Sequence, residues 1–261
     1  MVVTSRKNAA IQFYKKLLTN KRFREQEDLF CLEGFRLVNE MLLSKGEAKM
    51  ILASETFLAK NPAFITSNHL NQTDVLVISD ALAEYISDVP TPQGVFAVAK
   101  RLDKKCMLGT IKTMGRYLAL CQLQDPGNLG TILRSADAFG MDGVFLFHCC
   151  DIYSPKVVRS AMGALFHLPF ALCDDIHSFL ACCKSRHIIT YAAVVRNGVP
   201  ITDSAMHRGG ALLIGNEGNG LDEETASLCT ERITIPMRSS AESLNASVAA
   251  SLCMWEMFKD E

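Results

Sequence analysis

The sequence lacks the features that mark several classes of protein. No apolar run approaches the roughly 20 residues of a membrane-spanning helix, and the N-terminus has no apolar core of a secretory signal. The ten cysteines form no Cys-x-x-Cys pair, and the adjacent pairs 149–150 and 182–183 are poorly spaced for zinc. We therefore expect a cytoplasmic protein with reduced, mostly buried thiols, no membrane contact and no metal.

Several catalytic signatures are also missing. The chain has no nucleophile elbow, no His-Glu-x-x-His, no phosphate-binding loop ending in Gly-Lys-Ser/Thr and no Gly-x-Gly-x-x-Gly. The six histidines are scattered, and we interpret His167 and His177 as structural or exposed rather than catalytic. These absences exclude the common hydrolases and argue against a dinucleotide-binding enzyme.

Charge is unevenly distributed along the chain. The first 24 residues contain seven basic residues and no acid, so the net charge of −1 leaves −8 on the remainder. A basic arm on an otherwise acidic protein indicates contact with a polyanion, although a solvated helix face or a transit peptide gives a similar pattern. The candidate RNA-binding residues are Arg6, Lys7, Lys15, Lys16, Lys21, Arg22, Arg24 and Arg36.

Hydrophobic periodicity predicts two folded domains within the 261 residues. Helical spacing over 8–18 and 37–42, and short apolar runs at 30–32, 50–53, 75–78 and 94–99, predict a small α/β domain. The polar and basic stretch 100–105 is the linker candidate. We therefore divide the chain into residues 1–105 and 106–261.

The second half alternates strands and helices more regularly. Predicted strands cover 117–123, 143–148, 188–195, 211–214 and 232–235, and predicted helices cover 129–139 or start at Ser154, Asp174, Asp222 and Ser243. This order predicts an α/β fold with a mostly parallel sheet that is covered by helices on both faces. Ligands of such sheets bind at loops beyond the carboxyl ends of the strands.

Three of these loops are unusually polar or rich in glycine. Loop 125–134 joins a strand to a helix, so its backbone N–H groups can face an anion. Loop 215–220 has three glycines in six residues, which allow a ligand to approach the backbone closely. Segment 239–247 holds five Ser or Asn residues, more than one helix cap needs. We interpret the three loops as a polar site, with ordinary turns and caps as the alternative.

Arg134, at the end of the first loop, is the candidate for a charged residue that takes part in a reaction. It follows Gly130 by one helical turn, and helix side chains lean toward the N-terminus. The guanidinium is therefore predicted to lie over the glycine, beside the helix N-terminus, where it can bind a phosphate or carboxylate. A surface ion pair with Asp137 explains the spacing equally well.

Together the three loops resemble the three motifs of the SpoU/TrmH family (SPOUT superfamily) of RNA 2′-O-ribose methyltransferases. The matching residues are Asn128-x-Gly130-x-x-x-Arg134, then Ile214-Gly215-Asn216-Glu217-Gly218-x-Gly220-Leu221, then Ile235-Pro236-Met237 with Ser243-Leu244-Asn245-x-Ser247-x-Ala249. The segment from Ser154 to Ala164 also fits the family. The N-terminal half resembles, less specifically, the substrate-binding domain that often precedes this catalytic domain.

The resemblance implies a fold, a cofactor and a set of site residues. It implies an L30e-like RNA-binding domain over 1–105 and, over 106–261, a trefoil-knotted methyltransferase domain, although general topology rules argue against a knot. It further implies S-adenosylmethionine as cofactor and a homodimer. The helix that ends at 255–258 would then pack in the dimer interface or the knot, with ordinary core packing as the alternative. The implied catalytic residues are Asn128, Arg134, Glu217, Ser243 and Asn245, and the implied cofactor contacts are Ala192, Gly215, Ile235 and Leu244.

The implied chemistry restricts what Arg134 can do. The sulfonium already activates the methyl group, so neither a metal nor a covalent intermediate is required. A guanidinium has no free lone pair at neutral pH, so we expect Arg134 to act with an RNA phosphate while Asn128 and Glu217 hold it. The accessory domain and the basic arm favour ribosomal RNA, in particular large-subunit RNA, as substrate over transfer RNA. The alternatives are a transfer RNA methyltransferase, a non-catalytic RNA-binding or assembly protein, and an unrelated dinucleotide enzyme.

Overall fold

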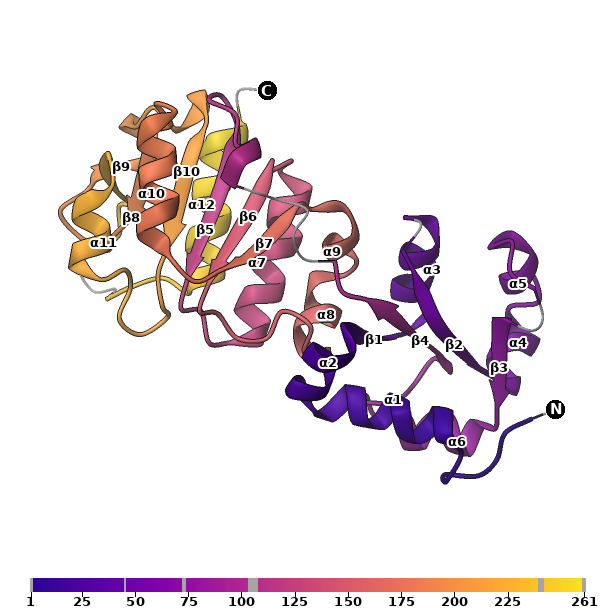
Figure 1. Cartoon of the computed structure of the whole chain (residues 1–261). Coiled ribbons are helices and arrows are strands. Elements are labelled where there is room, and N and C mark those ends of the chain that lie inside the picture. Colours follow the sequence, from indigo (N-terminus) through magenta and orange to yellow (C-terminus); the bar gives the residue numbers. More distant parts are fainter. Residues whose placement is uncertain (1, 45, 72–73, 103–107, 239–241, 260–261) are drawn as a thin grey trace. The chain divides into compact units, whose positions relative to one another are not determined.

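The computed structural model describes residues 2–44, 46–71, 74–102, 108–238 and 242–259 (Figure 1). Contacts within the chain divide it into two units, one made of Met1–Leu102 with Tyr153–Phe166 and the other of Asp103–Ile152 with His167–Glu261. The chain therefore passes from one unit to the other three times. The predicted boundary between residues 105 and 106 lies outside the described residues.

The first unit is built on a mixed sheet with the strand order β1-β4-β2-β3. Strand β4 pairs antiparallel with β1 and β2, whereas β2 and β3 are parallel. The apolar stripe predicted for residues 8–18 is buried, and Ile11, Tyr14 and Leu17 pack with Phe96 and Val98 in the core of this unit. The strands are β1 (Leu29–Glu33), β2 (Ala48–Ser54), β3 (Val75–Ile78) and β4 (Val95–Lys100), and the helices are α1 (Ala9–Thr19), α2 (Lys21–Glu27), α3 (Phe35–Leu43), α4 (Glu55–Lys60), α5 (Phe64–Ser67) and α6 (Asp80–Ile86).

Residues 153–166 belong to the first unit although they come from the second half of the sequence. Helix α8 (Pro155–Ala161) starts as predicted, because the Ser154 hydroxyl accepts from the third helical N–H and proline suits the first turn. The Tyr153 ring lies 4.9 Å from the buried Phe30 ring of β1, and its hydroxyl accepts a 2.6 Å hydrogen bond from the Leu102 N–H. A short helix, α9 (Ala164–His167), follows.

The second unit is built on a parallel sheet with the order β7-β6-β5-β10-β8-β11-β9. Its side chains alternate between two faces. Tyr117, Phe145 and Leu213 pack with Phe179 of α10 on one face. In Figure 1, α10 lies in front of this sheet, whereas α7 and α12 lie behind it. The strands are β5 (Arg116–Cys121), β6 (Gly143–Phe147), β7 (Phe170–Cys173), β8 (Thr190–Ala193), β9 (Val199–Pro200), β10 (Gly210–Ile214) and β11 (Glu231–Thr234), and the helices are α7 (Pro126–Ala138), α10 (Ile176–Ser185), α11 (Glu223–Leu228) and α12 (Ala246–Phe258).

The sequence prediction of this sheet was incomplete at both edges. It gave five strands and missed β7 and β9, which are the two edge strands of the sheet. Edge strands are paired on one side only, and these two are four and two residues long, so neither carries a long apolar run.

No helix in the described part of the chain is long and apolar enough to cross a membrane.

Candidate active site

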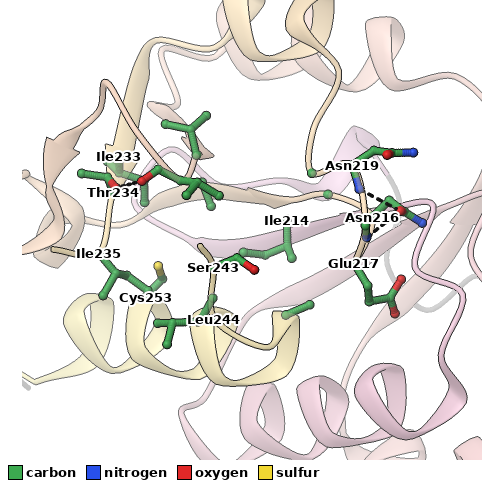
Figure 2. A pocket seen from close by; sticks show the side chains of 18 of the residues that line it. Ile214, Asn216, Glu217, Asn219, Ile233, Thr234, Ile235, Ser243, Leu244 and Cys253 are labelled. Atoms are coloured by element: carbon green, nitrogen blue, oxygen red, sulfur yellow. Dashed lines mark hydrogen bonds between the residues drawn. The ribbon is translucent and has the colours of Figure 1, made fainter. Parts of the chain in front are cut away.

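A cavity of about 210 Å³ lies at the carboxyl ends of β8, β10 and β11, beside the start of α12 (Figure 2). This is the edge of the sheet at which parallel α/β proteins bind their ligands. Figure 2 shows Ile214, Ile235 and Leu244 around the cavity, with Asn216 and Glu217 on one side of it. The lining residues are Ala193–Val195, Ile214–Gly220, Ile233–Ile235, Met237, Ser243, Leu244, Ala246, Ala249 and Cys253. Three of the four predicted cofactor contacts, Gly215, Ile235 and Leu244, are among them.

Ala192, the fourth predicted contact, does not line the cavity. In the parallel pairing of β8 with β10, Ala192 is opposite Leu213, whose side chain packs in the core on the α10 side. Ala193 points to the other face and lines the cavity. The resemblance implied cofactor contacts made largely through backbone groups, so a contact from the Ala192 backbone stays a prediction.

The backbone of the loop after β10 lies directly at the cavity, because its glycines carry no side chain. A Cβ atom on Gly215 would lie 2.1 Å from both the carbonyl carbon of Gly220 and the N atom of Leu221, so no other residue fits there. Asn216 and Gly220 exchange backbone hydrogen bonds of 2.8 and 3.0 Å, which fold the loop back on itself. The Asn216 side chain then donates to the Gln122 carbonyl at 2.8 Å, which ties the loop to the end of β5.

Glu217 ties this loop to the start of α7. Its Oε2 accepts from the Gln124 N–H and its Oε1 from the Asp125 N–H, both at 3.0 Å, and Oε1 also accepts from Asn128 Nδ2 at 3.3 Å. Partial burial raises the pKa of Glu217, but the hydrogen bonds from Gln124, Asp125 and Asn128 outweigh it and hold the pKa below its usual value. The carboxylate is therefore ionised at neutral pH.

The start of α7 differs from its prediction. Residues 125–128 were expected to form a turn, but the helix begins at Pro126, and the Asp125 carboxylate caps it by accepting from the Asn128 N–H at 2.8 Å. An acidic cap followed by proline is itself a helix-start signal, so the sequence contained the information. Asn128 consequently lies in the first turn of α7 and faces Glu217.

Asn245 joins the third motif to the first. Its Nδ2 donates to Asn128 Oδ1 at 2.9 Å, and its Oδ1 caps α12 by accepting from the N–H groups of Ser247 and Val248. The structure thus brings Asn128, Glu217 and Asn245 into one hydrogen-bonded set, although they lie up to 117 positions apart in the sequence. Ser243 lines the cavity beside them, whereas Ser239 and Ser240 lie outside the described residues.

Arg134 is exposed in the third turn of α7, one turn after the buried Gly130. It forms no hydrogen bond or ion pair with the described part of the chain. The alternative partner, Asp137, is instead 3.5 Å from His167 Nδ1. Helix α7 itself is fixed against α12, since the Ser251 hydroxyl donates to the Ser135 hydroxyl at 3.0 Å. The helix therefore presents a charged guanidinium to solvent from a rigid position.

One of the predicted RNA-binding residues is buried. The Arg24 side chain is 5% exposed and donates to the carbonyls of Leu17 and Leu18 at 2.6 and 3.1 Å, so it holds α1 against α2 and is not available to RNA. Lys15 is partly buried and donates to the Tyr85 carbonyl at 3.0 Å. The exposed members of the set are Arg6, Lys7, Lys16, Lys21, Arg22 and Arg36.

Two matches to known families follow the two halves of the chain. Residues 115–255 match the SpoU rRNA Methylase family, and residues 8–97 match the MRM3-like substrate binding domain. The chain belongs to the SpoU rRNA methylase family. The family predicted from the three motifs, its RNA 2′-O-methyltransferase class and its cofactor S-adenosylmethionine are confirmed.

Relatives of this SpoU methylase match it over nearly its whole length. The 23S rRNA (guanosine(2553)-2′-O)-methyltransferase RlmP of Bacillus subtilis is 32% identical over 98% of each chain. The 23S rRNA (uridine(2479)-2′-O)-methyltransferase of Streptomyces viridochromogenes is 29% identical over 97% of this chain and 90% of its own. The crystal structure of an AdoMet-bound rRNA methyltransferase from Sinorhizobium meliloti is 27% identical, with a TM-score of 0.86 over 100% of this chain and 98% of that one.

The cavity suits the cofactor of the SpoU methylases. Apolar side chains from Ile214, Ile235 and Leu244 can cover an adenosine, and the glycine loop offers backbone groups without side chains in front of them. The N–H groups of Gly215 and Leu244 donate to no described residue, so a ligand can accept from them. The described residues contain no group of three or more His, Cys, Asp or Glu that could hold a metal ion.

Proposed function

We propose that this SpoU methylase transfers the methyl group of S-adenosylmethionine to a ribose 2′-hydroxyl of large-subunit ribosomal RNA. One observation carries the proposal: the Glu217–Asn128–Asn245 set lies at the polar end of a cavity that suits the cofactor. Both ingredients of a methyl transfer, a donor pocket and polar groups for an incoming hydroxyl, are therefore adjacent. Two relatives are 23S rRNA 2′-O-methyltransferases, which supports the choice of RNA.

In this proposal the chain aligns two reactants instead of forming a bond with either. The bound cofactor supplies a methyl group that is already activated by the positive sulfur. Gly215, Ile235 and Leu244 hold the cofactor, and Ser243 and Asn245 orient the ribose. Alignment of reacting groups contributes a large share of the rate when the chemistry is intrinsically easy.

Arg134 assists removal of the 2′-proton without being a simple base. Its guanidinium stays protonated at neutral pH and offers five donors in a planar fork, a geometry that matches a phosphate. We assign it the binding of an RNA phosphate next to the target ribose, where the phosphate oxygen shares the proton. Its exposure and its lack of a partner among the described residues support this assignment.

The surface of α12 supports a homodimer. Val248, Leu252 and Trp255 are 48, 40 and 48% exposed and share one side of the helix, continued toward the cavity by Leu244, 37% exposed. Residues of this kind rarely gather on the free surface of a monomer, and a second copy of the chain would cover them. The cofactor cavity begins at Leu244, so the partner would lie beside each site.

The proposal extends to topology and location. Strand β11 lies between β8 and β9, and the chain then returns to the cavity before α12 packs on α7 and β10, an order that supports a C-terminal trefoil knot. The match of 8–97 to a substrate-binding domain supports an L30e-like RNA-binding role for residues 1–105. The exposed basic residues of α1 and α2, with Arg36, would contact RNA phosphates in the cytoplasm.

Methyl transfer from tritiated cofactor to purified RNA tests the proposal. Unmodified 23S rRNA is expected to accept tritium in a ribose, at a nuclease-resistant linkage, whereas transfer RNA from the same cells is not. Labelling of transfer RNA alone would replace the proposed substrate. Tight RNA binding with no labelling of either RNA would indicate a non-catalytic binding or assembly protein.

A further inference from the structure

A second, larger cavity lies within the first unit and takes no part in the site described above. It has a volume of about 670 Å³, compared with about 210 Å³ for the cofactor cavity. We call it the Phe35 cavity. It is lined by Phe35, Ser54, Thr56, Phe57, Lys60, Asn61, Asp80, Ala83, Glu84 and Pro90–Gly94. A cavity of this size and mixed polarity can hold a nucleobase.

Phe35 gives this cavity an aromatic wall that is supported from behind. Its ring centroid lies 6.0 Å from that of Phe57 and 6.2 Å from that of Phe64, and both of these rings are buried. Phe35 itself is 40% exposed. A ring that is fixed on one side and open on the other is the platform on which RNA-binding proteins stack unpaired bases.

Polar groups that lack partners stand beside this ring. Gln93 Oε1 accepts from the Phe35 N–H at 2.7 Å, which fixes the amide, while its Nε2 donates to no described residue. The Thr91 hydroxyl likewise forms no hydrogen bond with the described part of the chain, and the Lys60 ammonium is near enough to Asp80 to lower the pKa of that carboxyl. Donors in fixed positions next to an aromatic face can recognise the edge of a base.

The charges that line the cavity favour the base of a nucleotide over its phosphate. Asp80 and Glu84 line the cavity beside a single ammonium, Lys60, and Asp80 is held as a carboxylate by a 2.6 Å hydrogen bond from the Thr56 hydroxyl. The described lining is therefore negative overall and disfavours a phosphate. Thr91 and Gln93 also line a neighbouring cavity together with Arg36. Arg36 is exposed and forms no ion pair with described residues, so it can take the phosphate of the same nucleotide.

We propose that the Phe35 cavity holds one unstacked base of the substrate RNA, which stacks on Phe35 and bonds to Gln93 and Thr91 while Arg36 binds the adjoining phosphate. The statement that the bound polymer is RNA rests on the proposed function. In this arrangement the first unit selects RNA by an unpaired nucleotide as well as by charge. An RNA whose bases are all paired would bind only through its phosphates.

Binding of two fluorescein-labelled RNAs by the full-length protein tests the proposal: a single-stranded hexa-adenylate and a fully paired hairpin of similar charge. Phe35→Leu keeps an apolar side chain against Phe57 but removes the stacking face. It is expected to weaken hexa-adenylate binding by about tenfold, the usual effect of losing one base–aromatic contact, and to leave hairpin binding unchanged. Phe35→Tyr should restore binding, and Leu43→Ala, at a 65% exposed position on the same helix, should have no effect.

A second variant keeps the test decisive if Phe35→Leu lowers the unfolding temperature. Arg36→Gln alters an exposed side chain, and loss of one phosphate contact should reduce the salt dependence of hexa-adenylate binding by about 0.7 in the log–log slope. Equal affinities for wild type and Phe35→Leu, an equal loss on the hairpin, or an unchanged slope for Arg36→Gln would overturn the proposal.

Methyl transfer to 23S rRNA, measured on the same proteins, separates this proposal from the proposed function. If wild type methylates 23S rRNA and Phe35→Leu does so with an unchanged KM, the base site is wrong and the function stands. If wild type methylates no RNA but Phe35→Leu still loses hexa-adenylate selectively, the base site stands and the function fails.

Discussion

Replacement of Glu217 by Gln removes the negative charge that accepts hydrogen bonds from two backbone N–H groups. Each carboxylate oxygen accepts one of these N–H groups at 3.0 Å, from Gln124 and Asp125. The glutamine amide keeps one oxygen, but its NH₂ group must face the other donor. A hydrogen bond to a charged group contributes about 1.5–3 kcal/mol. Since Glu217 is only partly buried, we expect a loss near the lower end, about 2 kcal/mol.

Thermal unfolding of the full-length protein measures this loss. For a unit of this size, about 2 kcal/mol corresponds to a fall of roughly 4–8 °C in the unfolding midpoint at pH 7. Glu224→Gln is the matched control, because its side chain is 78% exposed and its one ion pair, to His177, is 4.0 Å long. The control is expected to unfold within about 1 °C of wild type.

The pH dependence gives the prediction a second readout. The folded state holds the pKa of Glu217 below its ordinary value, so its stabilising contribution is full above the ordinary value and disappears as the pH falls through the folded value. The difference between wild type and Glu217→Gln should therefore be largest at neutral pH and vanish in acid. An unchanged midpoint at pH 7, or a difference that persists at pH 2, would refute the role assigned to this carboxylate.

Three further predictions concern the cofactor, the reaction and the dimer. Gly215→Ala should weaken S-adenosylmethionine binding at least tenfold by calorimetry, because its Cβ would lie 2.1 Å from the Gly220 backbone; wild-type affinity would contradict the close packing. Arg134→Lys should abolish methyl transfer while calorimetry shows nearly intact cofactor binding, since an ammonium lacks the planar fork; retained turnover would remove Arg134 from the reaction. Trp255→Glu should shift the sedimenting species from dimer to monomer, and an unchanged dimer would place the interface elsewhere.

The site could be predicted from sequence where its residues lie in short motifs with their own geometry. The glycine loop at 215–220 and the position of Arg134 on a helix were visible as local patterns. Asn128 was instead predicted in a turn, and the last helix was predicted to start at Ser243, whereas Asn128 lies in the first turn of α7 and Asn245 caps α12. Their joining through Glu217 was not derivable from spacing, because it depends on which strands neighbour each other in the sheet. The resemblance to a family supplied that information.

The errors arose where burial decides the role of a residue. Arg24 and Lys21 look alike in a basic arm, yet α1 and α2 enclose the first and leave the second exposed. Ala192 and Ala193 point to opposite faces of β8, and the cavity is lined by Ala193, a distinction that the sequence does not give. Phe35 gave no signal of its own, because its ring contacts with Phe57 of α4 and Phe64 of α5 cannot be read from the sequence.

The assignment of residues 153–166 to the first unit limits how the protein can be divided. A fragment that ends at residue 105 would lack the Tyr153 ring that covers Phe30 and the hydroxyl that receives the Leu102 N–H. Its β1 would present a bare aromatic surface and invite aggregation. To exchange the RNA-recognition half between two such enzymes, a protein engineer would have to transplant two separate stretches of sequence, and the shorter one interrupts the chain between β6 and β7 of the donor sheet.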